Sequence, residues 1–178
     1  YQNTPEDGSV QKLPVFGFTD TCSFMTYGYD PALAKFSPYL SAQYSVVEAL
    51  AKLAAMGADP AKARLTNQEY FERLGKDPKK WGAPTQALLG LIQAQMAMDT
   101  PSIGGKDSMS GTFNDIHVPP TLITFAVTYG STDDVISASF KEAGHSLYVL
   151  KHTPKADGIP AYAQLKAHFA SLREENHK

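Results

Sequence analysis

The residues best suited to chemistry lie in one run, GGKDSMSG, from Gly104 to Gly111. Glycines permit positive φ angles and a close approach of the backbone to a ligand. Successive backbone N–H groups in such a turn can form an anion-binding concavity. Lys106 offers a point charge for a phosphate oxygen, and Asp107 offers a hard oxygen ligand for magnesium. The run therefore predicts a turn that binds a nucleotide phosphate together with its metal.

The same run has a second interpretation that needs no ligand. It is not a Walker A loop, which requires Gly-x4-Gly-Lys-Ser/Thr, because Asp107 follows Lys106 and Thr100 stands five residues before Gly105. A glycine-rich turn in which Asp107 or Ser108 caps the next element fits these residues equally well. From the run alone, a phosphate site and a purely structural turn both stay open.

The composition narrows the class of protein. A length of 178 residues suits one globular domain and the start of another, and 43% hydrophobic with 19% charged residues fits a folded protein. The net charge of -2, spread along the chain, argues against nucleic-acid binding, which usually needs a clustered basic face. No apolar run suits a membrane span, no signal peptide is recognisable, and the single Cys22 excludes an internal disulfide. We therefore expect a cytoplasmic protein without a membrane partner, and Cys22 as a small buried hydrophobe. The chain lacks an initiator methionine and is expected to be a fragment.

Hydrophobic periodicity predicts the secondary structure. Thr66 to Glu69 has the form of a capping box and predicts a short helix through Leu74. Pro84 is placed at the first turn of a helix that is apolar all round and is therefore expected to be buried on both sides. The full prediction is strands over 15–27, 121–129 and 145–150, and helices over 41–56, 66–74, 84–98 and 162–172.

The order of these elements favours an α+β fold, with a mixed or antiparallel sheet and helices on one face. The helices are grouped between early and late strands, which does not suit a doubly wound parallel fold. A change of composition near 130–140 divides the chain into a domain over 1–139 and the beginning of another over 140–178.

Beyond these patterns, the chain resembles the phosphoribosylformylglycinamidine synthase family in its large, single-chain form. The resemblance rests on the pairing of GGKDSMS, from Gly104, with VPPTLITFA, from Val118, and it covers about residues 15–150. Shorter matches are YGYDP over 27–31, VEAL over 47–50 and QEYFERL over 68–74.

The resemblance implies an activity and a place in a larger enzyme. The whole enzyme, a ligase and glutamine amidotransferase of purine biosynthesis, converts formylglycinamide ribonucleotide, ATP and glutamine into the amidine. ATP phosphorylates the amide oxygen, and ammonia from a glutaminase domain displaces the phosphate. Residues 1–139 would be the N-terminal-type domain of the second aminoimidazole-ribonucleotide-synthetase-like copy, with 140–178 beginning the C-terminal-type domain. The catalytic histidine belongs to the first copy, so no catalytic residue and no activity are expected of this piece by itself.

The resemblance also implies site residues. Asp107 and Glu48 match ligands of Mg²⁺, and the positions expected at the phosphates of ATP, ADP or substrate are Gly105 and Ser108, with Gly104, Lys106 and Ser110 beside them. Lys52 departs from the family, which carries an asparagine ligand four residues after the glutamate. An ammonium group cannot ligate magnesium, and Glu48 with Lys52 forms an ordinary i, i+4 pair. Either Lys52 replaces a cation at a phosphate, or this copy has lost one metal.

Three hypotheses therefore stay open. The chain is a piece of the amidine synthase that contributes a nucleotide site, or a non-catalytic structural domain that holds an auxiliary nucleotide or supports the interdomain sheet. The third is another enzyme of the superfamily, such as aminoimidazole ribonucleotide synthetase or selenophosphate synthetase. In addition, the strands over 15–27 and 121–129 would expose an apolar face without their neighbouring domain, so we expect self-association through this sheet.

Overall fold

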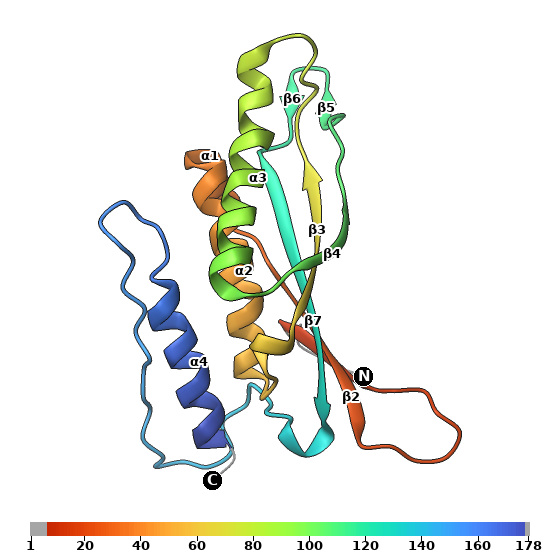
Figure 1. Ribbon diagram of the computed structural model, residues 1–178, viewed down its shortest axis with the longest axis vertical. Helices are drawn as coiled ribbons and strands as arrows, with labels where there is room; N and C mark the ends of the chain where they lie inside the picture. Colours follow the sequence, from red (N-terminus) through yellow and green to blue (C-terminus); the bar gives the residue numbers. More distant parts are fainter. Residues whose placement is uncertain (1–6, 177–178) are drawn as a thin grey trace.

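Five strands form one sheet, and the helices cover one of its faces (Figure 1). The computed structural model describes residues 7–176. Across the sheet the order is β1 (Gly8–Lys12), β2 (Thr21–Gly28), β7 (Thr121–Ser131), β3 (Arg64–Tyr70) and β4 (Ser102–Lys106). Neighbouring strands are antiparallel except β3 and β4, which run parallel. Two short strands, β5 (Thr112–Phe113) and β6 (Ile116–His117), form a separate hairpin.

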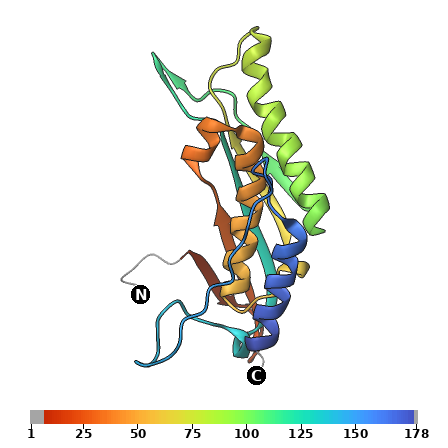
Figure 2. The ribbon, with the colours of Figure 1, turned by 90° about the vertical axis from the view of Figure 1, so that its left-hand side faces the viewer.

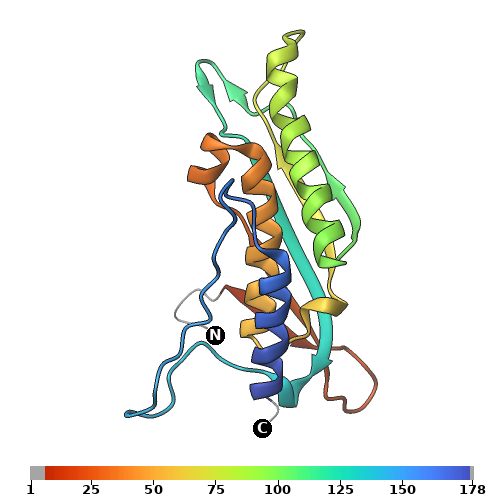
Figure 3. The ribbon, with the colours of Figure 1, turned by 60° about the vertical axis from the view of Figure 1, so that its left-hand side comes forward.

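The helices pack as a layer on the sheet and on one another (Figures 2 and 3). Asp30, Ser37 and Asp77 each accept hydrogen bonds from backbone N–H groups at the start of α1, α2 and α3. A Cβ at Gly90 of α3 would lie only 2.1 Å from the Tyr39 carbonyl oxygen, so the two long helices cross closely because this residue is glycine. None of the helices in the described range is long and apolar enough to cross a membrane. The α-helices are α1 (Pro31–Phe36), α2 (Pro38–Ala55), α3 (Pro78–Met98) and α4 (Tyr162–Asn176), with 3-10 turns η1 (Pro60–Lys62) and η2 (Thr132–Asp134).

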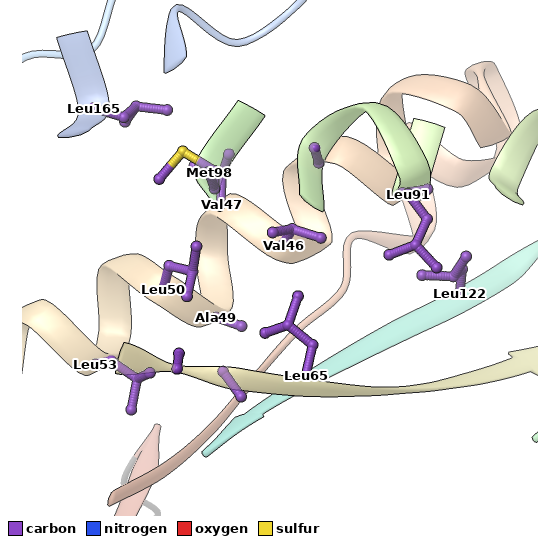
Figure 4. Close-up of a cluster of buried hydrophobic side chains, with 14 of the residues drawn as sticks. Val46, Val47, Ala49, Leu50, Leu53, Leu65, Leu91, Met98, Leu122 and Leu165 are labelled. Carbon is purple, nitrogen blue, oxygen red and sulfur yellow. The ribbon is translucent and has the colours of Figure 1, made fainter. Parts of the chain in front are cut away.

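The hydrophobic core lies between the helix layer and the sheet (Figure 4). Fully burying a leucine or valine side chain is worth about 1.5–3 kcal/mol relative to leaving it exposed. Helix α2 is the central element of the core, because its buried residues contact α1, α3 and α4 as well as strands β2 and β7. The core residues labelled in the close-up come from α2 (Val46, Val47, Ala49, Leu50, Leu53), β3 (Leu65), α3 (Leu91, Met98), β7 (Leu122) and α4 (Leu165).

The predicted α+β class, with a mixed sheet and helices on one face, is confirmed. The predicted helices over 41–56 and 162–172 and the strand over 121–129 correspond to α2, α4 and β7, each within a few residues. Cys22 is buried in the core, as expected of a small hydrophobe.

One predicted strand is shorter than expected, and another is absent from the described residues. The strand over 15–27 begins only at Thr21, because residues 15–20 form the loop from β1, where Phe16 and Phe18 are exposed. The segment 145–150 forms no strand, and Leu147, Tyr148 and Val149 are exposed. A strand needs partners for its backbone groups, and apolar β-branched sequence alone does not supply them.

The predicted helix over 66–74 is also wrong, since most of it is strand β3. Leu65, Asn67 and Glu69 point toward the helices, while Thr66 and Gln68 alternate to the other face. The strand pairs with β7 along its whole length and with β4 on its other side. These non-local hydrogen bonds outweigh the local capping signal.

Helix α3 begins earlier and is less buried than predicted. Pro78 occupies its first turn after the N-cap Asp77, and Pro84 lies inside the helix. Leu88, Ile92 and Met96 of α3 are exposed, so burial on both sides is wrong within the described residues.

The C-terminal helix packs on the same core as the sheet. The Tyr162 hydroxyl donates to Gln43 Oε1 at 2.6 Å, and the Tyr44 hydroxyl donates to the Gly158 carbonyl at 3.0 Å. Leu165 is buried against this cluster. The division into domains over 1–139 and 140–178 stays a prediction.

Candidate phosphate and metal site

Gly104 to Lys106 of the glycine-rich run lie in the edge strand β4, and Asp107 to Gly111 follow it without regular secondary structure. Gly104 and Gly105 lie in β4, and neither has a positive φ. A Cβ at Gly105 would lie 2.6 Å from the Asn67 carbonyl oxygen, whereas nothing lies within 4 Å of one at Gly104. Gly105 is thus required by the approach of β4 to β3, and Gly104 leaves open space beside the backbone.

Lys106 and Asp107 point to opposite sides of the sheet. Gln68 pairs with Lys106 in the parallel register, and the Lys106 ammonium lies 5.7 Å from the centre of the Tyr70 ring on the uncovered face. Asp107 follows on the helix side, where it lines a groove beside Glu69. The two side chains therefore leave the backbone on opposite faces, although both residues line the groove, and their joint role at a phosphate stays a prediction.

Ser108 and Ser110 lie where the chain leaves β4. The Ser108 N–H donates to the Glu69 carbonyl at 3.0 Å, and its own carbonyl accepts from the Phe71 N–H at 2.9 Å. This backbone extends the pairing with β3, so neither Asp107 nor Ser108 caps a helix here. The Ser108 and Ser110 hydroxyls lie 2.9 Å apart and form a polar pair at the surface.

A groove of about 590 Å³ separates α3 from β3 and β4. One wall is the apolar side of α3, and the other is the glycine strand with its following residues. Five of the seven predicted site residues thus lie at or next to this groove: Gly104, Gly105, Lys106 and Asp107 line it, and Ser108 follows directly. The remaining lining residues are Asn67, Glu69, Trp81, Pro84, Thr85, Leu88, Leu91, Gln95, Ser102 and Met109.

Glu69 is a carboxylate inside this groove that was not among the predicted site residues. It is 6% exposed, and its Oε1 is buried without a hydrogen-bond partner. Burial, and secondly the charge of Asp107, raise the pKa of Glu69 to about 7. A strand in which Leu65, Asn67 and Glu69 share one face would have predicted that this side chain is buried. The capping-box pattern predicted a helix instead, so the signal was missed.

A chain of buried hydrogen bonds fixes the floor of the groove. The Ser45 and Thr124 hydroxyls lie 2.7 Å apart, and Thr124 donates to Asn67 Oδ1 at 3.0 Å. Asn67 Nδ2 donates to the Ser102 hydroxyl, and the Ser102 N–H donates to Gln95 Oε1 at 2.7 Å. The network links α2, β7, β3, β4 and α3, so the groove walls are positioned by polar contacts as well as packing.

Glu48 lies elsewhere and is engaged by its own neighbours. Its Oε1 is 2.7 Å from Lys52 Nζ, and its Oε2 accepts from the Tyr29 N–H at 2.9 Å. Burial lowers the pKa of Lys52, but the hydrogen bond and charge of Glu48, with Asp7, outweigh it and the pKa ends above its ordinary value. Tyr29 follows β2, which lies three strand spacings, roughly 14 Å, from β4. Glu48 and Asp107 are therefore not brought together.

The described residues hold no group of three or more His, Cys, Asp or Glu that could enclose a metal ion. A cation at the groove would have to take most of its ligands from water or from phosphate oxygens, which is how Mg²⁺ is usually held. Asp107 fits this requirement, because its carboxylate faces open space at the edge of the sheet.

Comparison with known proteins defines the class to which this arrangement belongs. No protein-family model matches the chain. Over 136 residues it is 31% identical to phosphoribosylformylglycinamidine synthase subunit PurL of Streptomyces avermitilis, and 30% identical to that of Streptomyces coelicolor, covering 74% of this chain in both cases. The chain spans 17% of the length of each relative.

Solved structures agree on the fold. Thermotoga maritima PurL complexed with FGAR superimposes with a TM-score of 0.70 at 16% identity, covering 96% of this chain and 25% of that one. The ADP complex of the same protein gives 0.70 at 15% identity, covering 96% and 26%. The fold and the edge strand beside the groove thus define an α+β domain of the type found in PurL. The chain belongs to the phosphoribosylformylglycinamidine synthase PurL family, of which it carries one domain-sized segment.

Proposed function

We propose that this chain is part of an ATP-dependent amidotransferase that makes formylglycinamidine ribonucleotide, and that its groove contributes a phosphate and Mg²⁺ site. The observation that carries this proposal is the edge strand β4, whose glycines and Asp107 open into the groove beside α3. The relatives are PurL subunits, and the Thermotoga maritima protein has been solved with ATP, ADP and FGAR, which supports a nucleotide or substrate phosphate at this kind of domain.

The residues of the groove divide the task. Gly105 lets β4 lie close to β3, Asp107 holds its carboxylate at the groove, and the Ser108 and Ser110 hydroxyls offer hydrogen bonds beside it. When bound, Mg²⁺ supplies charge neutralisation for phosphate oxygens. Lys106, on the other side of the sheet, would serve a ligand or domain bound there. No described residue is assigned a catalytic role.

The test is a substitution in the full-length enzyme that contains this segment. Asp107→Asn is expected to reduce ATP-dependent amidine formation by about 100-fold, as for loss of a preorganised electrostatic group. Asp115→Asn is the control, since Asp115 is exposed in the β5–β6 hairpin. Unchanged turnover in Asp107→Asn, with normal folding, would contradict the proposal.

The alternative is a non-catalytic domain that holds an auxiliary nucleotide or supports the interdomain sheet. The Glu48–Lys52 ion pair favours it, because it neutralises a carboxylate that the resemblance assigns to metal. Under this alternative, Asp107→Asn leaves turnover intact but lowers thermal stability or releases bound nucleotide. The same variant therefore separates the two functions.

The face of the sheet that the helices leave uncovered is the surface through which this chain is proposed to contact a second sheet. Met25 lies opposite Val127, and Tyr27 lies opposite Phe125, all of them partly exposed. We propose that a second copy covers this face when the remaining domains are absent, and that in the whole enzyme those domains, with a glutaminase, are the partners. The predicted absence of nucleic-acid and membrane partners and the cytoplasmic location stay predictions.

A further inference from the structure

Glu69 has the environment of a ligand whose partner is missing. Its side chain is 6% exposed and lines the groove between α3 and the strands, and its buried Oε1 has no hydrogen-bond partner. A buried carboxylate without a partner is costly to fold, so such a group is usually paired or coordinates a metal. Packing alone therefore does not account for a glutamate at this position.

Asp107 is the nearest acidic neighbour of Glu69 in the groove. Gln68 pairs with Lys106 in the parallel register, and the Ser108 N–H donates to the Glu69 carbonyl at 3.0 Å. Continuing this register places Glu69 beside Asp107, and both line the same groove. The two carboxylates thus come from β3 and from the residue that directly follows β4, and both line the same groove.

Neither carboxylate is neutralised from within the described residues. No Lys, Arg or His of the segment 7–176 forms an ion pair with Glu69 or Asp107. Lys106 lies over Tyr70 on the far side of the sheet, and Lys80 pairs with Glu72 at 2.6 Å. A cation that balances the ionised form of Glu69 would therefore come from outside the described residues.

We propose that Glu69 and Asp107 together bind one divalent cation in this groove, with water or nucleotide phosphate oxygens completing its coordination. Two carboxylate oxygens are the hard ligands that Mg²⁺ and Mn²⁺ prefer, and Mg²⁺ is commonly held by one or two carboxylates with substrate phosphates. The groove of about 590 Å³ leaves room for the ion with its water. The inference rests on the proposed function for Asp107, adds Glu69 as the second ligand, and removes Glu48 from this cation.

The chain contains its own reporter for this site. Trp81, the single tryptophan, lines the same groove. Tb³⁺, an oxygen-seeking substitute for divalent cations, should emit on excitation of Trp81 when it binds at Glu69 and Asp107. Competition with Mn²⁺ and Mg²⁺ in the intact chain then gives their affinities without any assay of activity.

Four variants make the measurement specific. Loss of even an outer partner of a metal ligand costs about 10- to 100-fold in metal affinity, so Glu69→Gln and Asp107→Asn should each weaken cation binding by about tenfold or more. Asp115→Asn, exposed in the β5–β6 hairpin, should bind as the parent does. Glu48→Gln should also leave the Trp81-sensitised signal unchanged.

The outcomes distinguish this inference from the proposed function. Weakening by Asp107→Asn alone overturns the role of Glu69 but leaves Asp107 as a ligand. Weakening by neither variant overturns both, as does loss of the signal in Glu48→Gln alone. A signal lost equally in Asp115→Asn means adventitious surface binding and also overturns the inference.

Thermal unfolding provides a second measurement that does not depend on luminescence. A ligand that binds the native state raises the melting temperature, so Mn²⁺ should raise it more in the parent chain than in Glu69→Gln. Without cation, Glu69→Gln should melt at or above the parent, since the neutral amide removes an unpaired buried charge. An equal rise with Mn²⁺ in both proteins would count against the site.

Discussion

Asp107 and Lys106 are neighbours in the chain, yet their side chains lie on opposite sides of the sheet. The Lys106 ammonium lies 5.7 Å from the centre of the Tyr70 ring, while Asp107 lines the groove beneath α3 with Glu69. The extended backbone of β4 enforces this separation, because successive side chains of a strand alternate between faces. Within the described residues, Lys106 forms no ion pair with Glu69 or Asp107, although it is one of the residues that line the groove.

The two glycines of β4 should respond differently to alanine. Gly105→Ala places a Cβ 2.6 Å from the Asn67 carbonyl oxygen, so the strands must separate, and we expect a loss of about 1–3 kcal/mol of unfolding free energy. Gly104→Ala meets nothing within 4 Å and is the matched control, expected to change stability by less than about 1 kcal/mol. Urea unfolding of the two variants measures the difference, and equal stabilities would contradict the geometry.

Stability should depend on pH through Glu69. Its folded pKa is about 7 against an ordinary 4.5, so the native state keeps a proton that the unfolded chain releases between these values. The contribution of Glu69 to the unfolding free energy is therefore most favourable below about pH 4.5. It falls by about 3 kcal/mol at most as the pH rises toward 7, and it is constant above that pH.

Glu69→Gln isolates this contribution, since other groups titrate in both proteins. In the absence of divalent cations, the unfolding free energy of the parent minus that of the variant should decrease between pH 4.5 and pH 7. A difference that is flat across this range would show that Glu69 ionises normally.

The Glu48–Lys52 pair should behave as a modest local ion pair. Lys52 is 17% exposed and Glu48 is 39% exposed, and the pair is spaced i, i+4 on α2. A double-mutant cycle with Glu48→Gln and Lys52→Met is expected to give a coupling free energy of no more than about 1 kcal/mol. Its sign and size can be read from chemical unfolding at low and high salt. A coupling of several kcal/mol would indicate a buried role that the exposures do not suggest.

The uncovered sheet face should drive self-association of the isolated chain. Phe125 and Val127 of β7 lie at its centre, opposite Tyr27 and Met25 of β2. Phe125→Lys introduces a charge there and should shift the chain toward monomer in light scattering across a concentration series. Phe16→Lys is the control, because Phe16 is exposed in the β1–β2 loop away from this face. A parent chain that is monomeric at high concentration would contradict the proposal.

Local sequence determined the elements whose signals are strong and self-contained. Helices α2 and α4 and strand β7 follow from periodicity and β-branched composition, and their grouping indicated an α+β fold. The GGKDSMSG run and the Pro-Pro strand were sufficient to indicate the family, because that combination does not depend on knowing the fold. Cys22 was expected to be buried, and it is.

Tertiary structure decided the parts that depend on partners distant in the chain. The capping-box pattern at Thr66 predicts a helix, but pairing with β7 and β4 makes this segment a strand. Glu69 is therefore a buried carboxylate in the groove and not a helix residue. Pairing with β3 likewise gives the start of the glycine run an extended backbone, and as a result the side chains of Lys106 and Asp107 lie on opposite faces of the sheet. A strand obtains its hydrogen bonds from other strands, so its existence, its register and the direction of its side chains cannot be settled by neighbouring residues alone.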